Sequence, residues 1–122
     1  MPQTHVVLYQ EDDGSVPLLK WLDRLHNKAR AKVLVRIERL KELGSQLRRP
    51  EADYLRDGIY ELRISLQRIH HRVLYFYSGR TVAVLSHGLV KDREVPPREI
   101  ELAVRRKSRF EDDPEAHTYS EA

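Results

Sequence analysis

Four basic residues in the second half of the chain have types and spacings suited to holding a phosphate group. Arg63 lies in "YELRIS" and Arg72 in "HHRVLYF". His87 and Lys91 follow, four residues apart, in "SHGLVK". An arginine fork matches phosphate oxygens and a lysine supplies a point charge, whereas a histidine can transfer a proton near neutral pH. If these side chains converge, they form a cationic pocket that can bind a phosphodiester and stabilise the charge that develops during its cleavage.

RNA suits such a pocket because its own 2′-hydroxyl group can serve as the nucleophile. A protein that cleaves RNA in this way needs positioning, a base, an acid and positive charge, but neither a metal ion nor a covalent nucleophile. The sequence contains no HExxH motif, no EF-hand loop and no carboxylate pair on one predicted face, and so it gives little support to a metal-dependent nuclease. We expect no metal site and no cofactor.

Each candidate residue also has a simpler interpretation. Arg63 and Arg72 could be partners in structural ion pairs, His87 could end a strand, and Lys91 could be an ordinary loop lysine. His70 is of a type that is often solvated or used in packing. Only the joint placement of these residues on one face of a sheet would favour a site.

The first half of the chain predicts a short strand and two helices. Residues 4–9, "THVVLY", are rich in β-formers and predict the strand. A helix is expected from about Pro17, and a longer, strongly basic helix is expected over residues 27–43, with Gly44 as its C-terminal stop. Residues 45–58 are interpreted as a connector that ends in an Asp-Gly turn.

The second half predicts three strands and a last helix. The strands span residues 59–66, 68–77 and 81–88, and short turns between them indicate an antiparallel core. The helical pattern covers residues 97–113. The order β-α-α-β-β-β-α predicts an α+β fold, in which a curved, mainly antiparallel sheet carries helices on one face. Because strand residues alternate between faces, we expect Arg63 on the uncovered face.

Length and composition indicate one domain in a reducing compartment. The chain has 122 residues and no cysteine, so we expect a single domain over residues 1–112 in the cytoplasm. Residues 113–122 are polar and acidic, which predicts a disordered tail. Neither an apolar run long enough to span a membrane nor a signal peptide is visible. We therefore expect no membrane partner.

The net charge of +3 is unevenly distributed along the chain. Residues 28–49 carry +6 and residues 59–91 carry +4, whereas residues 111–122 carry −5. Basic central segments favour an anionic partner such as nucleic acid. The alternative is a solvated helix face followed by a disordered tail, and charge alone does not separate the two.

Three stretches in order resemble the phage-derived HigB-like toxins of the RelE superfamily. These stretches are "DGIYELR" (57–63), "HRVLYFY" (71–77) and "VLSHGLVKDREVPPREIELA" (84–103). The resemblance covers roughly residues 4–108. It implies a RelE-like fold, ribosome-dependent cleavage of mRNA, and neutralisation by an antitoxin that carries a helix-turn-helix DNA-binding domain.

The resemblance also implies roles for individual residues. Arg63 matches the arginine of the family's Glu-Leu-Arg element, and Arg72 matches the arginine that opens the third strand. His87 and Lys91 match the histidine and the first lysine of a His-Gly-Phe-x-Lys-Lys stretch. Asp92 stands where a second lysine is common, which removes positive charge beside the expected phosphate site.

Three functions follow as hypotheses. The first is the toxin of a type II toxin–antitoxin system, an mRNA endoribonuclease that acts at the ribosome through 2′-hydroxyl attack, with His87 as base or acid. Further RNA contacts are expected from Arg36 and Arg39 of the basic helix and from Arg68 and His70 of the second long strand. The second is a non-catalytic RNA- or ribosome-binding module. The third is a phage-derived accessory protein whose charge only keeps it in solution.

Overall fold

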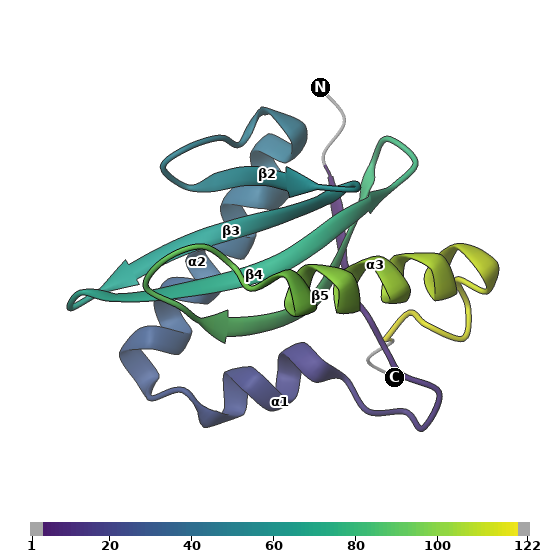
Figure 1. Ribbon diagram of the computed structural model, residues 1–122, viewed down its shortest axis with the longest axis horizontal. Helices are drawn as coiled ribbons and strands as arrows, with labels where there is room; N and C mark the ends of the chain where they lie inside the picture. The colour runs from purple at the N-terminus through teal and green to yellow at the C-terminus, as the bar shows by residue number, and fades with distance from the viewer. Residues whose placement is uncertain (1–3, 120–122) are drawn as a thin grey trace.

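A five-stranded sheet lies at the centre of the computed structural model, which describes residues 4–119 (Figure 1). The strand order is β1-β5-β4-β3-β2, and only the β1–β5 pair is parallel. The predicted α+β class with a mainly antiparallel sheet is therefore confirmed. The strands are β1 (His5–Leu8), β2 (Ala52–Arg56), β3 (Ile59–Leu66), β4 (Ile69–Ser78) and β5 (Val82–Val90).

Three helices complete the fold at the positions that the sequence predicted. Helix α1 (Pro17–Arg24) and helix α3 (Pro97–Asp112) each begin at a proline, which is tolerated there because the first helical N–H groups have no partner inside the helix. Helix α2 (Asn27–Leu43) ends at Gly44, whose φ of 52° lies in the left-handed region that favours glycine. No helix within residues 4–119 is long and apolar enough to cross a membrane.

Strand β2 was missed, because its sequence was interpreted as part of a connector. It pairs antiparallel with β3, with Tyr54 opposite Tyr60. The Asp-Gly turn that follows it was recognised, and Asp57 and Gly58 indeed take positive φ values of 53° and 80°, as a tight hairpin turn requires. The stretch "ADYLR" lacks a run of β-branched residues, so only its place before the turn marks it as the first arm of a hairpin.

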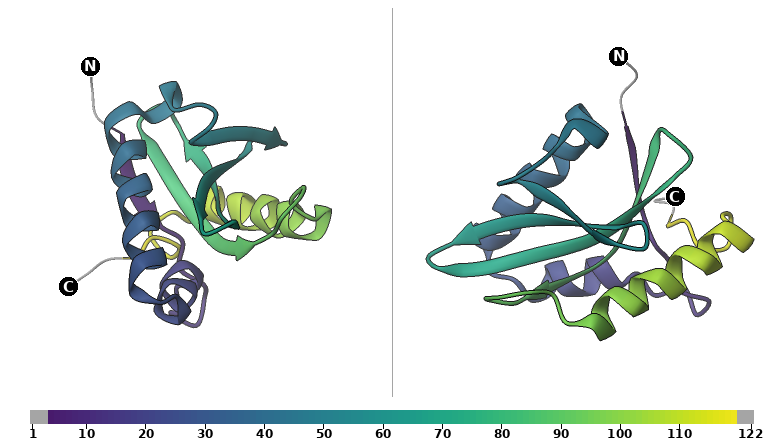
Figure 2. Two further views of the ribbon diagram at one scale, coloured as in Figure 1. Left: turned by 90° about the vertical axis from the view of Figure 1, so that its left-hand side faces the viewer. Right: turned by 45° about the horizontal axis from the view of Figure 1, so that its top comes forward.

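Helices cover both faces of the sheet, so the prediction of helices on one face is wrong (Figure 2). Helices α1 and α2 pack on one face, around a core that includes Trp21 and Leu62. Helix α3 packs on the other face, around a core that includes Phe76 and Phe110. The continuous apolar run at residues 73–76 explains the difference, since a strand buried on both faces shows such a run instead of alternation.

The C-terminal segment differs from the predicted disorder over residues 113–119. It folds back on the N-terminal strand, where Thr118 forms a β-bridge with Tyr9. The ring of His117 stacks on that of Tyr9 at a centroid distance of 5.2 Å, and its Nδ1 lies 2.8 Å from the Gln10 carbonyl oxygen. Stacking and hydrogen bonding therefore fix a stretch whose composition alone suggested disorder. Residues 120–122 of the predicted tail lie outside the described residues.

Candidate functional site

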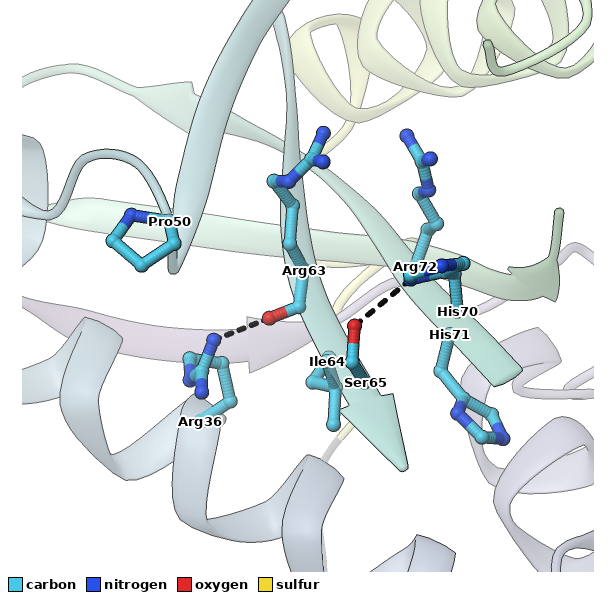
Figure 3. Close-up of a pocket in the computed structure, with 8 residues that line it drawn as sticks. All are labelled: Arg36, Pro50, Arg63, Ile64, Ser65, His70, His71 and Arg72. Carbon is cyan, nitrogen blue, oxygen red and sulfur yellow. Dashed lines mark hydrogen bonds between the residues drawn. The ribbon is translucent and has the colours of Figure 1, made fainter. Parts of the chain in front are cut away.

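Two of the predicted site residues, Arg63 and Arg72, lie side by side on neighbouring strands. They are directly opposite each other in the β3–β4 ladder, so their side chains share one face, the face on which α3 packs. Figure 3 shows both guanidinium groups extending in the same direction. Two like charges at this spacing repel, and a third residue, Glu61, compensates for them.

The carboxylate of Glu61 joins the two arginines. Its Oε2 lies 2.8 Å from Arg63 Nη1, and its Oε1 lies 2.6 Å from Arg72 Nη1. The carboxylate is only 1% exposed, so it is a buried and fully paired charge. Two guanidinium groups and one carboxylate leave a net charge of +1, which favours an anionic ligand.

Arg63 is the more accessible of the two arginines. Its side chain is 30% exposed, whereas that of Arg72 is 8% exposed. Arg72 also donates from Nη2 to the Arg93 carbonyl oxygen at 2.8 Å, which ties it to the loop before α3. Arg63 therefore has the donors that can reach a ligand. Arg72 is buried beside it, where it contributes positive charge and fixes the loop before α3 through Arg93.

Arg63 and Arg72 together separate two hollows in the surface. The first has a volume of about 260 Å³ and is shared with Arg36, Ser65 and His70 (Figure 3). The second has a volume of about 430 Å³ and is also lined by Tyr54, Arg56, Asp92 and Arg93. The pair thus lies between the two hollows and contributes to the lining of both.

His70 is at the first hollow, although the sequence suggested only an RNA contact for it. It lies opposite Ser65, and the Ser65 hydroxyl is 2.8 Å from His70 Nδ1. The exposed Arg68 is in the turn just before it, at a φ of 68°. Both therefore lie at the end of the β3–β4 hairpin, beyond the two arginines.

His87 does not join the two arginines at a hollow. It shares their face of the sheet, but it is not among the residues that line either hollow. It is 8% exposed, its Nε2 lies 2.9 Å from Glu99 Oε1, and Arg106 Nη1 donates to its Nδ1 at 3.1 Å. Burial is the main cause that lowers the pKa of His87, and the charge of Arg106 adds to it. Both ring nitrogens are thus engaged inside the protein.

Lys91 also stays apart from the arginine pair. It follows the last residue of β5 and is exposed, and its N–H donates to the His70 carbonyl oxygen at 3.1 Å. It lines a separate hollow with Asp92 and Arg93. The convergence expected for four residues is therefore found for Arg63 and Arg72, with His70 in place of His87.

The two arginines of α2 that were predicted to contact RNA, Arg36 and Arg39, form ion pairs with a carboxylate. Arg39 holds Glu51 with two bonds of 2.9 Å, and Arg36 Nε lies 3.5 Å from the same carboxylate. Arg36 also donates to the Arg63 carbonyl oxygen, and it lines the first hollow. These contacts fix α2 to the β2–β3 region and bring one of its arginines to the site.

Acid is expected to destabilise the fold through His87. Because the pKa of His87 is lowered in the folded state, its contribution to stability is complete above the unfolded pKa of about 6.5 and is lost as the pH falls below it. The pKa of His71 is lowered in the same direction, mainly by burial. Urea midpoints at pH 7.5 and 5.5 should differ less for His87→Gln than for the wild type. If both proteins show the same pH dependence, His87 does not contribute to the loss of stability in acid. The matched control is His5→Gln, because His5 is at an exposed position.

Sequence reasoning missed two residues of the site, Glu61 and Ser65. Both share the parity of Arg63 along β3, and this was the signal that could have found them, because residues two apart in a strand share a face. The residues predicted to form the pocket are mainly basic, and their pattern gives no indication that a buried carboxylate joins them.

Comparison with known proteins gives one family. No curated protein matches the chain. A family model described as "Phage derived protein Gp49-like (DUF891)" matches residues 20–108, which are 89 of the 122 residues. The matched region includes the second half of α1, all of α2, strands β2 to β5 and most of α3, and so it contains the arginine pair. The chain therefore belongs to the Gp49-like family of phage-derived proteins.

Proposed function

We propose that this protein is the toxin of a type II toxin–antitoxin system, with a RelE-like fold, and that it cleaves mRNA at the ribosome. The observation that carries this proposal is the pairing of Arg63 and Arg72 across a buried Glu61, between two hollows of the surface. The Gp49-like family, which is associated with toxin–antitoxin systems, supports the toxin role. The resemblance to HigB-like toxins supports the choice of mRNA as substrate.

The proposed chemistry uses the nucleophile that RNA itself supplies. The 2′-oxygen attacks the adjacent phosphorus, the bond from phosphorus to the 5′-oxygen breaks, and the products are a 2′,3′-cyclic phosphate and a 5′-hydroxyl. Negative charge builds on the phosphate oxygens in the transition state. Arg63 would donate to them, because within residues 4–119 only its Nη1 has a hydrogen-bond partner, Glu61. Preorganised donors of this kind typically contribute ~10²–10³ in rate each.

The proposed partners follow from the same surface. Arginines at the second hollow, together with Arg68 at the hairpin end, give a basic rim that ribosomal RNA could contact. A cognate helix-turn-helix antitoxin in the cytoplasm would neutralise the toxin by covering this rim. The acidic residue Asp92 also lines the second hollow, and it is expected to weaken phosphate binding there.

Replacing Arg63 tests the proposed activity. Induced wild-type protein should arrest growth and produce new 5′-hydroxyl ends in translated mRNA, whereas Arg63→Ala should relieve the arrest and lower cleavage by ~10²–10³-fold. Arg24→Ala is the matched control, because Arg24 is an exposed arginine of α1 outside both hollows. If folded Arg63→Ala cleaves ribosome-bound mRNA as fast as the wild type, the site assignment is wrong.

A non-catalytic RNA- or ribosome-binding module is the second candidate. It is favoured by Asp92 at the second hollow and by the internal engagement of both His87 nitrogens. Such a module would bind RNA with a salt slope of about −0.7 per phosphate contacted on a single strand, but it would produce no new RNA ends. Mapping of RNA ends alongside a salt titration separates the two functions.

A further inference from the structure

The face of the sheet that carries Arg63 is organised in cross-strand rows. Successive rows on one face are two residues apart, which is about 6.6 Å along the strands. One row that α3 covers ends in His87, the next row holds the two arginines, and the row beyond them holds His70. In order, these rows are Glu61–Leu74–His87, then Arg63–Arg72–Leu89, then Ser65–His70.

The two histidines therefore flank the arginine row from opposite sides, in different surroundings. Helix α3 covers the row of His87, and Glu99 and Arg106 of that helix bond to its two ring nitrogens. A ring held in this way cannot accept a proton from a ligand without breaking an internal contact. Its role is to join α3 to the sheet.

His70 has the opposite environment. It is half-buried, lines the first hollow with Arg63 and Arg72, and bonds through Nδ1 to Ser65. Within residues 4–119, its Nε2 has no hydrogen-bond partner. The neighbouring His71 points to the other side of the strand (Figure 3). Ser65 thus fixes one nitrogen of the ring and leaves the other available at the hollow.

We propose that His70, and not His87, is the general base of the phosphodiester site; this inference rests on the proposed function. Nε2 of His70 accepts the proton of the RNA 2′-hydroxyl as the 2′-oxygen forms its bond to phosphorus. The bond between phosphorus and the 5′-oxygen breaks with its electron pair, and the 5′-oxygen takes a proton from water. His70 then returns its proton to the hydroxide that remains, so no net proton is consumed.

The charges around His70 suit a step that develops negative charge. The cations that line the first hollow with it are Arg36 from α2, Arg63 from β3 and Arg72 from β4. No carboxylate is among the described residues that line the first hollow, and Glu61, on the same face of the sheet, is buried and bonded to both site arginines. A phosphate that bridges from Arg63 into the first hollow would therefore meet cations on several sides and one imidazole.

Single-site variants assayed with purified ribosomes and a defined mRNA test this assignment. His70→Ala should lower kcat by ~10²–10⁴-fold with little change in RNA affinity, and added imidazole should restore part of the rate. Ser65→Ala should lower kcat less, since it only frees the ring. His5→Ala is the control, because His5 is an exposed histidine on edge strand β1.

The outcomes separate this inference from the proposed function. Loss of rate with imidazole rescue supports His70 as the base. If His70→Ala cleaves at the wild-type rate while Arg63→Ala does not, the function stands and the assignment of His70 is overturned. Loss of rate without rescue, accompanied by an equal loss of RNA affinity, assigns His70 to binding and also overturns it. If wild-type protein makes no cuts, or cuts RNA that has a 2′-deoxy group at the cleaved position, the proposed function itself fails.

Discussion

Replacing Glu61 with alanine is expected to lower the free energy of unfolding by about 3–5 kcal/mol. The variant removes the only carboxylate that pairs with Arg72 within residues 4–119, and the Arg72 side chain is only 8% exposed in the wild-type structure. A buried charge without a partner is strongly destabilising, because its desolvation is no longer offset. Urea denaturation at pH 7.5 measures the change.

A second carboxylate in the same protein provides the matched control. Glu51 also joins two arginines, Arg36 and Arg39, but its side chain is 25% exposed and that of Arg39 is 42% exposed. Exposed ion pairs contribute little because water and salt screen them. Glu51→Ala should therefore cause only a small fraction of the loss seen for Glu61→Ala. Equal losses in the two variants would contradict the burial argument.

A double substitution separates the cost of an orphaned charge from that of lost packing. If Glu61→Leu is combined with Arg72→Met, both charges of the buried Glu61–Arg72 pair are removed, and most of the stability should return. Activity should not return with it, because the proposed site loses both Arg72 and the carboxylate that aligns Arg63. Such a result would show that the buried charge network orients the arginines of the site and does not stabilise the fold more than apolar residues would.

The arginine pair was predictable because it depends only on regular features of strands. Alternation along β3 and a short turn into β4 are enough to place Arg63 and Arg72 on one face. The same alternation places Glu61 there, although its role became visible only once its burial was known. In regular strands, a pair of side chains opposite each other can therefore be predicted from the sequence.

His87 was not predictable in the same way, because it depends on an irregularity. The β4–β5 register shifts so that Leu74 faces His87 while Tyr75 faces Leu85, which leaves Ser86 as an extra residue. Without that bulge, His87 would share the face of Leu85, on the side of α1 and α2. Gly88, two residues after Ser86, is of a type that often marks a bulge, but it does not identify which residue of the strand is the extra one.

The cover over His87 was the larger error, and it follows from the position of α3. Sequence periodicity predicted this helix, but not the face of the sheet on which it packs. A helix that follows the last strand can pack on either face. Helix α3 packs on the face of Arg63 and covers the row that contains His87, while the arginines lie at the edge of the helix. His70, which lines the first hollow, is therefore the better candidate for the base.

Replacing Gly88 with alanine is the other change expected to have a large effect on stability. Helix α1 lies so close to β5 that a Cβ atom on Gly88 would come 2.1 Å from the ring of Trp21. Trp21 is 8% exposed and belongs to the core between α1, α2 and the sheet. A rigid indole in a packed core cannot move aside easily, so α1 must shift outward, and we expect a loss of about 1–3 kcal/mol or more.

A cycle with Trp21→Leu tests whether this close contact is the cause. Trp21→Leu destabilises the protein by itself, because it leaves a cavity, but it also removes the ring that a Cβ atom on Gly88 would meet. Gly88→Ala should therefore cost much less in the Trp21→Leu background than in the wild type. Gly79→Ala is the comparison for backbone effects, because its Cβ would meet nothing within 4 Å although its φ is 66°. If Gly88→Ala costs the same in both backgrounds, the packing of α1 against β5 is looser than this contact implies.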